Sequence, residues 1–228
     1  MKTLLVGLML LAPCFASHAG VAIGGTRFVY EEKNPQLNIT LENSDARPYL
    51  VKTQILQPDT FPGAERGAVS PFVATPPLFV LNGGKQNKIR LVSDGGALAK
   101  DKETLFDLVI TAIPSSTEKA SDNTVQVAIR SHLKLFYRPA NLQGNPEKAY
   151  QHISWKRDGG GVTVKNPTPF YVTLFGVTVN GNSVNNAGVV APFGSRKMAW
   201  CTEGERCLIQ WQSINDFGKT LSIQQITI

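Results

Sequence analysis

A lysine inside an apolar run is the residue of this sequence best suited to holding a charged partner. Lys134 is the one charged residue within residues 133–137, whose other members are leucine, phenylalanine and tyrosine. An ammonium among bulky apolar side chains costs free energy unless it has a partner. Lys134 is therefore either an ordinary lysine whose head group reaches water, or a cation kept for the charged end of another chain.

An alternating apolar pattern precedes this lysine in the same stretch, residues 123–140. Val125, Val127 and Ile129 stand at every second position. In a β-strand, side chains at alternate positions lie on one face. The pattern predicts either the buried face of a sandwich or an exposed ridge that pairs with another chain.

The elements around this stretch are predicted to be short strands. Apolar alternation and the turn residues between the runs indicate them, and helical periodicity is absent apart from a short turn expected near residues 94–102. We therefore expect an all-β protein of two sandwiches of about a hundred residues each, joined near residues 143–146. Besides 123–140, the expected strands are 27–30, 37–41, 49–55, 72–73, 78–80, 88–92, 103–113, 162–164, 171–179, 197–200, 207–211 and 221–228.

The first 19 residues have the pattern of a secretory signal peptide. Lys2 is followed by an apolar run at residues 4–12, and Ala19 ends a small-residue cleavage motif. The run is too short to span a membrane. A lipoprotein signal at Cys14 is disfavoured by Pro13 directly before it. We expect export and cleavage near Ala19.

Charge and cysteine content exclude several classes of protein. The formal net charge of +6 is spread along the chain, without the basic cluster of a nucleic-acid binder. Cys201 and Cys207 are an even pair in an exported chain, which suggests a disulfide. His132 and His152 are too few for a metal site with these cysteines, so no metal and no cofactor are expected.

Six sequence blocks occur in an order that resembles a known family. Two are highly specific together: Lys-Leu-Phe-Tyr-Arg-Pro at 134–139 and Asn-Pro-Thr-Pro-Phe-Tyr-Val-Thr at 166–173. The others are Gly-Thr-Arg-Phe-Val-Tyr at 25–30, Ala-Thr-Pro-Pro at 74–77, Asp-Lys-Glu-Thr-Leu-Phe at 101–106 and Ile-Asn-Asp-Phe-Gly at 214–218. Over essentially all of the chain after residue 19, the sequence resembles the periplasmic pilus-assembly chaperones, the PapD- and FimC-like proteins.

The resemblance implies a fold, partners and a mechanism. Two immunoglobulin-like sandwiches, residues 20–142 and 143–228, would form an L or boomerang. In the periplasm of a Gram-negative bacterium, such a chaperone binds pilin subunits one to one, completes each with a donor strand and delivers it to an outer-membrane usher. Val125, Val127 and Ile129 match the residues that fill the subunit groove. The exposed ridge could also support a self-capping homodimer of the free chain.

Seven further residues match positions with roles in this family. Arg27 and Lys134 match two cations that hold the subunit's C-terminal carboxylate; from spacing alone, the plainer interpretation is that Arg27 pairs with a local acid and Lys134 reaches water. Glu103, Arg138 and Asp216 match an ion-pair network between the domains, which could otherwise be three unrelated surface charges. The two cysteines match a disulfide of the second domain in some members.

Two residues depart from the family pattern, and two other classes of protein fit the sequence less well. Asp107 and Val109 stand where the family usually has an aromatic residue and an asparagine. An enzyme is disfavoured because no Gly-x-Ser-x-Gly or phosphate-binding loop is present. The alternative function is a secreted fibre subunit or adhesin, although residues 20–25 are too short for the extension that strand exchange between fibre subunits requires.

Overall fold

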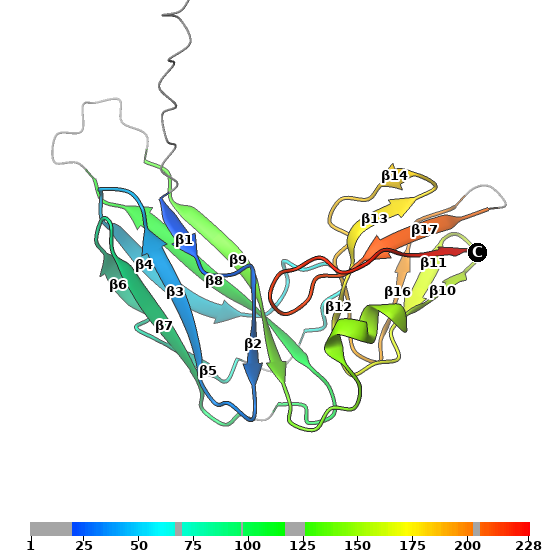
Figure 1. Ribbon diagram of the computed structural model, residues 1–228, viewed down its shortest axis with the longest axis horizontal. Helices are drawn as coiled ribbons and strands as arrows, with labels where there is room; N and C mark the ends of the chain where they lie inside the picture. Colours follow the sequence, from blue (N-terminus) through cyan, green and yellow to red (C-terminus); the bar gives the residue numbers. More distant parts are fainter. Residues whose placement is uncertain (1–19, 67–69, 97, 117–125, 203–205) are drawn as a thin grey trace, which may run out of the picture.

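The protein consists of two β-domains that meet at an angle, as Figure 1 shows. The computed structural model describes residues 20–66, 70–96, 98–116, 126–202 and 206–228. Each domain has its own hydrophobic core. Within these ranges, no helix is long and apolar enough to cross a bilayer. The predicted signal peptide, residues 1–19, and Val125 lie outside the described residues.

The first domain is a sandwich of two sheets, with strand orders β1-β3-β7-β5 and β2-β9-β8-β4-β6. The apolar alternation read from the sequence is the reason for this arrangement: in β3, Ile39 and Leu41 face the core while Glu42 is exposed. The strands are β1 Val21–Ile23, β2 Arg27–Glu31, β3 Leu37–Asn43, β4 Tyr49–Leu56, β5 Phe72–Thr75, β6 Leu78–Leu81, β7 Gln86–Ser93, β8 Thr104–Pro114 and β9 Ile129–Arg138.

Strand β9 lies between β8 and β2 over only part of its length. It pairs with β8 from Ile129 to Tyr137. It pairs with β2 in parallel, starting where Arg27 lies opposite Lys134. In the described part of the chain, the β2 side of β9 therefore has no partner strand before Lys134. This leaves residues 129–133 as a free sheet edge with unpaired backbone groups.

The second domain begins with a short 3-10 helix and continues as three small sheets, β10-β11-β16, β12-β15 and β14-β13-β17-β18. The predicted disulfide between Cys201 and Cys207 is confirmed. The elements are η1 Pro146–Gln151, β10 Ser154–Arg157, β11 Val162–Lys165, β12 Val172–Thr173, β13 Phe175–Val179, β14 Asn182–Ser183, β15 Val189–Val190, β16 Ser195–Met198, β17 Leu208–Gln212 and β18 Gln224–Thr227.

Three local predictions were wrong. The helix η1 was not expected, because six residues are too few to show a period; Asn145 caps it by accepting the backbone N–H of Glu147. The single strand expected at 171–179 is two strands in different sheets, and Gly176 has a φ of +55° at the irregularity. No helical turn is present in the described part of residues 94–102.

Candidate functional site

Two cations stand side by side at the junction of the domains. Arg27 is the first residue of β2, and Lys134 is its partner in the parallel β2–β9 ladder. Neither forms an ion pair with any carboxylate in the described part of the chain. Two like charges on neighbouring strands repel each other, so the pair favours an anion that can approach both.

Arg27 is fixed by the second domain rather than by an acid. Its guanidinium donates to the backbone carbonyl of Ile214 and the hydroxyl of Thr173, and more weakly to the carbonyl of Asn215 at 3.4 Å. The guanidinium carbon also lies 5.2 Å from the ring centre of Phe136. Burial lowers the pKa of Arg27 from its ordinary value. The plainer interpretation, in which Arg27 pairs with a local acid, is therefore wrong for the described residues.

Lys134 is half-buried beside an aromatic ring. Its Nζ lies 4.3 Å from the ring centre of Phe61, a cation–π contact. Burial, followed by the charge of Arg27, lowers the pKa of Lys134 to about 8. The ammonium thus has an unfavourable environment in the free chain, and a bound carboxylate would relieve it.

A hollow of about 470 Å³ opens from Lys134 toward the second domain. The second domain's wall includes Thr173, Phe175 and Ile214. Lys134 lines this cleft directly, and Arg27 lies next to it, because its guanidinium binds Thr173 and Ile214 of the wall. The cleft can therefore receive the end of a chain between the two domains.

The predicted ridge is exposed where the structure describes it. The side chains of Val127 and Ile129 are 67% and 53% exposed. The strand begins at Ile129, later than the sequence predicted, because the β8–β9 register would set Val127 opposite Pro114. Proline has no N–H to donate to the ladder. The Pro114 carbonyl accepts a hydrogen bond from the side-chain amide of Gln126.

The three charges predicted at the hinge lie in one network. Arg138, at the end of β9, binds Glu103 through Nε at 2.7 Å and Asp216 through both terminal nitrogens at 2.6 and 3.0 Å. Glu103 also accepts the Tyr171 backbone N–H at 2.7 Å. Burial alone would lower the pKa of Arg138, but hydrogen bonds to Asp216 and the charge of Glu103 raise it above its ordinary value. The network joins the linker strand to both domains.

Family models match both domains of the chain. The model of the pili and flagellar-assembly chaperone PapD N-terminal domain matches residues 20–143, and that of the pili assembly chaperone PapD C-terminal domain matches residues 148–225. The chain belongs to the PapD family of pili assembly chaperones. The predicted division at residues 142/143 itself remains a prediction.

Relatives and solved structures agree with this assignment. The chain is 40% identical to the uncharacterized fimbrial chaperone YcbF of Escherichia coli K12, covering 88% of this chain and 85% of that one. It is 35% identical to the chaperone FimC of E. coli K12, covering 89% and 82%. The structure is similar to a chain of the Salmonella enterica SafA pilin–SafB chaperone complex, with a TM-score of 0.80, 29% identity and coverage of 92% and 96%.

A further structural match is the E. coli chaperone DraB, with a TM-score of 0.76, 32% identity and coverage of 91% and 98%. These matches confirm the predicted fold of two immunoglobulin-like sandwiches and the predicted family. They identify a fimbrial chaperone, and so favour that interpretation over a fibre subunit or adhesin.

Asp107 and Val109, which depart from the family pattern, are both buried in β8. The Asp107 carboxylate accepts a hydrogen bond from Thr60 at 2.9 Å, and the same oxygen lies 2.7 Å from Nδ1 of His132. Asp107 therefore belongs to a polar cluster beside the cleft. Val109 adds apolar packing.

Sequence reasoning missed the contacts that residues 58–65 make with Lys134 and Asp107. This segment joins β4 to β5 and carries both Thr60 and Phe61. It also missed Arg196, which binds the carbonyl of Pro62 from the second domain at 3.3 Å. Pro58, Pro62 and Gly63 are typical of a loop, and no local pattern reveals contacts made after the domains dock.

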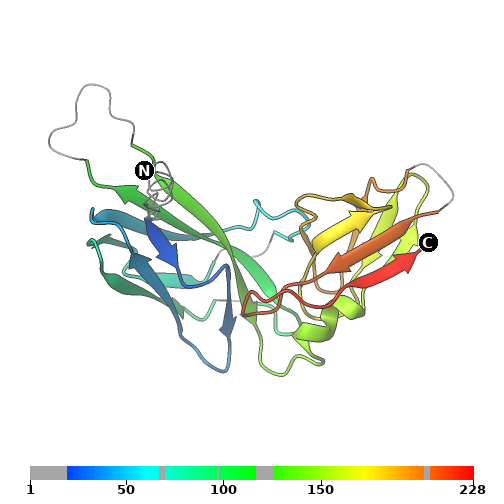
Figure 2. The same cartoon turned by 45° about the horizontal axis from the view of Figure 1, so that its top comes forward.

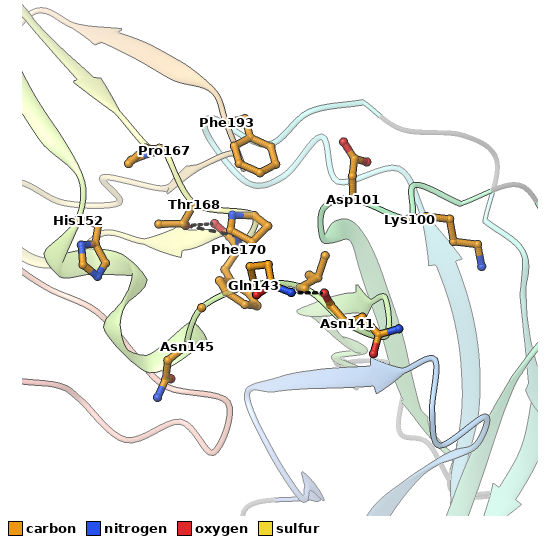
Figure 3. Close-up of a pocket in the computed structure, with 13 residues that line it drawn as sticks. Lys100, Asp101, Asn141, Gln143, Asn145, His152, Pro167, Thr168, Phe170 and Phe193 are labelled. Carbon is orange, nitrogen blue, oxygen red and sulfur yellow. Dashed lines mark hydrogen bonds between the residues drawn. The ribbon is translucent and has the colours of Figure 1, made fainter.

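A second hollow, of about 600 Å³, lies at the hinge near Pro167 and Phe193 (Figure 3). Lys100 also lines it, but its ammonium is paired with Glu32. No pair of free cations faces this hollow among the described residues, so it does not suit a carboxylate as the cleft does.

Proposed function

We propose that this chaperone captures fimbrial subunits by lending them β9 as a donor strand, and that Arg27 and Lys134 hold the subunit's terminal carboxylate. It acts in the periplasm after removal of the signal peptide near Ala19, and delivers the subunits to an outer-membrane usher. Membership of the PapD family supports the class of partner.

The observation that carries the proposal is where the free edge of β9 ends. The edge at residues 129–133 stops at Lys134, where β2 starts with Arg27. Strand β2 runs parallel to β9. A guest strand with the same direction would lie in line with β2, and its last residue would reach the two cations. The terminal carboxylate of the guest strand would thus lie beside the two cations, at the point where the free edge of β9 ends.

Strand pairing of this kind would satisfy the unpaired backbone groups of both the chaperone and the subunit. A subunit that lacks one strand has unpaired backbone groups and an apolar groove. The free edge supplies hydrogen bonds, while Val125, Val127 and Ile129 would fill the groove, each burial contributing roughly 1.5–3 kcal/mol before ordering costs. The carboxylate fixes the register, since a slip of one residue would turn the apolar face outward.

The remaining features fit the same mechanism. The Glu103–Arg138–Asp216 network holds the domains so that Arg27 and the second domain's wall stay together. In the absence of a subunit, the exposed edge and ridge would pair with a second copy of the chain, giving a self-capped homodimer.

Coexpression with a fimbrial subunit in the periplasm tests the proposal. A subunit with its native C-terminus should copurify with this chain one to one. The same subunit extended by several residues at its C-terminus should be captured poorly, because its carboxylate no longer meets Arg27 and Lys134. A tag in a surface loop of the subunit is the control. Equal capture of the extended and native subunits would exclude the carboxylate anchor.

A further inference from the structure

Between β4 and β5, the chain leaves the first domain as a loop that we call the strap, residues 58–65. Figures 1 and 2 show this cyan segment reaching from the first domain toward the second. Two internal hydrogen bonds shape it: Phe61 N–H donates to the Pro58 carbonyl at 3.1 Å, and Ala64 N–H to the Phe61 carbonyl at 3.0 Å. Three successive residues of the strap each contact a different part of the protein.

Thr60 ties the strap to the sheet that carries Lys134. Its hydroxyl donates to Asp107 Oδ2 at 2.9 Å. Asp107 is the partner of Lys134 in the β8–β9 ladder, so the two side chains lie on the same face of the sheet. The other oxygen of Asp107 is buried without a hydrogen-bond partner among the described residues. The carboxylate thus contributes favourable charge near the ammonium.

Phe61 covers the lysine itself. Its ring centre lies 4.3 Å from the Lys134 ammonium. The ring also packs against the buried cluster shared by the two domains, which includes Leu105, Phe136 and Val189. Phe61 is therefore held from both domains while it contacts the cation.

Pro62 joins the strap to the second domain. Its carbonyl accepts the Val189 backbone N–H at 2.8 Å and a weaker bond from Arg196 at 3.3 Å. The backbones approach so closely that a Cβ on Gly188 would lie 2.1 Å from the Pro62 oxygen. Only a glycine fits there, also because its φ is +81°.

We propose that the strap is a positioning element for Lys134, through which the placement of the second domain sets where the ammonium points. Phe61 is the positioning residue, Thr60 fixes the strap to Asp107, and Pro62 transmits the position of the second domain. As far as subunit capture is concerned, this inference rests on the proposed function.

A positioned cation binds a carboxylate more tightly than a free one. A lysine side chain loses rotamer freedom when it is immobilised, and a strap that orders it in advance removes that cost from binding. The ring also excludes water from one side of the ammonium, which strengthens its attraction to an incoming carboxylate. An anchor of this kind discriminates between a chain end at the correct register and one displaced along β9.

The geometry can be measured directly by NMR of protein carrying ¹³C at the lysine ε position. Protons above an aromatic ring shift upfield, so the Lys134 ε signal, assigned with Lys134→Arg, should be upfield of ordinary lysines. Phe61→Leu keeps an apolar cover but removes the ring, and should abolish the shift. Phe61→Tyr should retain it. Phe193→Leu, at the hinge hollow away from Lys134, is the matched control and should leave the shift unchanged.

The same variants are then tested for capture of a subunit that the wild-type chain binds. Phe61→Leu should weaken capture about tenfold, while Phe61→Tyr and Phe193→Leu remain within twofold of wild type. If Phe61→Leu loses the shift but captures normally while Lys134→Ala fails to capture, the strap does not position the anchor, and the proposed function survives. If Lys134→Ala itself captures normally, the proposed function fails.

Arg196→Met tests the link to the second domain, because Arg196 contacts the strap at Pro62. Weakening this contact should move the Lys134 signal part of the way toward ordinary lysines and weaken capture two- to fivefold. Gly188→Ala adds a Cβ 2.1 Å from the Pro62 oxygen and so also disturbs the stronger bond from Val189. An unchanged signal and unchanged capture in both Arg196→Met and Gly188→Ala would show that the second domain does not set the position of Lys134. That outcome would overturn the inference.

Discussion

Glu103 and Arg138 form a buried ion pair at the hinge, with Oε1 of Glu103 2.7 Å from Nε of Arg138. The other oxygen of Glu103 accepts the Tyr171 backbone N–H at 2.7 Å. Glu103 is only 3% exposed, so its carboxylate depends on these partners rather than on water. One side chain of the first domain is thereby bound to the linker strand and to the second domain at once.

Removing the charge of Glu103 should destabilise the protein and loosen the hinge. We expect Glu103→Gln to lower the free energy of unfolding by about 2–4 kcal/mol, since a buried guanidinium loses one of its two acidic partners. Urea unfolding followed by fluorescence measures this, because Trp155, Trp200 and Trp211 all lie in the second domain. Small-angle scattering should also detect a wider range of interdomain angles.

Asp216→Asn is the matched control for Glu103→Gln. Asp216 binds the same guanidinium, but its side chain is 30% exposed. Solvent screens this pair more strongly, so its loss should cost about 1 kcal/mol. Equal destabilisation by both variants, or none by Glu103→Gln, would contradict a hinge fixed mainly by the buried carboxylate.

Loss of either anchor cation should strongly weaken capture without unfolding the chain. Lys134→Ala removes a charge-assisted bond to the carboxylate, and we expect roughly 10- to 100-fold weaker binding of a subunit. Arg27→Ala should act similarly and also loosen the contacts to Thr173. Lys88→Ala, at an exposed position of β7, is the control. Circular dichroism checks folding, and normal capture by both cleft variants would count decisively against the anchor.

Capture should weaken as the pH rises through about 8. Burial and the charge of Arg27 lower the pKa of Lys134 to about 8, and a neutral amine does not attract a carboxylate. Subunit affinity measured from pH 7 to 9.5 should therefore fall in the wild type. Lys134→Arg, which stays charged over this range, should give a flat profile. A fall of equal size in Lys134→Arg would assign the pH dependence to other groups.

Stability of the free chain should change in the opposite direction over the same range. The pKa of Lys134 is lower in the folded chain than the ordinary value of 10.5, so between about 8 and 10.5 the unfolded chain binds more protons. The contribution of Lys134 to the free energy of unfolding therefore increases with pH in that window. Comparing wild type with Lys134→Met isolates this contribution, because methionine carries no proton to lose.

Local sequence patterns predicted the strands because sandwich strands alternate apolar and polar residues, as Ile39, Leu41 and Glu42 do. The roles of Arg27 and Glu103 followed from a family resemblance, since no local pattern links them to Lys134 or Arg138. The cation–π contact of Phe61 with Lys134 was not predictable in this way. It depends on a loop held by Val189 of the other domain, and so on packing between segments distant in sequence.

The exposed ridge shows a second limit of prediction from sequence, which concerns the pairing of β8 with β9. Alternation predicted a strand that includes both Val127 and Ile129, but only Ile129 belongs to β9, because a local pattern does not show where the ladder stops. That limit is set by Pro114 on β8, which falls opposite Val127 and lacks an N–H. Only the pairing of β8 with β9 reveals this.

A charge on the exposed ridge should impair capture but not folding. Val127 is 67% exposed in the free chain, so Val127→Asp removes little from the protein's own core and should change the free energy of unfolding by less than about 0.5 kcal/mol. In the subunit groove, the same carboxylate would be buried without a partner, at a cost of several kcal/mol. Capture should therefore fall more than 100-fold while the free chain remains soluble.

Val73→Asp is the control for this prediction. Val73 is 55% exposed on β5, in the opposite sheet, so its variant adds the same charge away from the donor edge and should capture normally. If the charge instead acted through general repulsion of the subunit, both variants would capture poorly. If Val127→Asp unfolded the free chain, the ridge would belong to the protein's own core, and β9 could not be lent to a subunit.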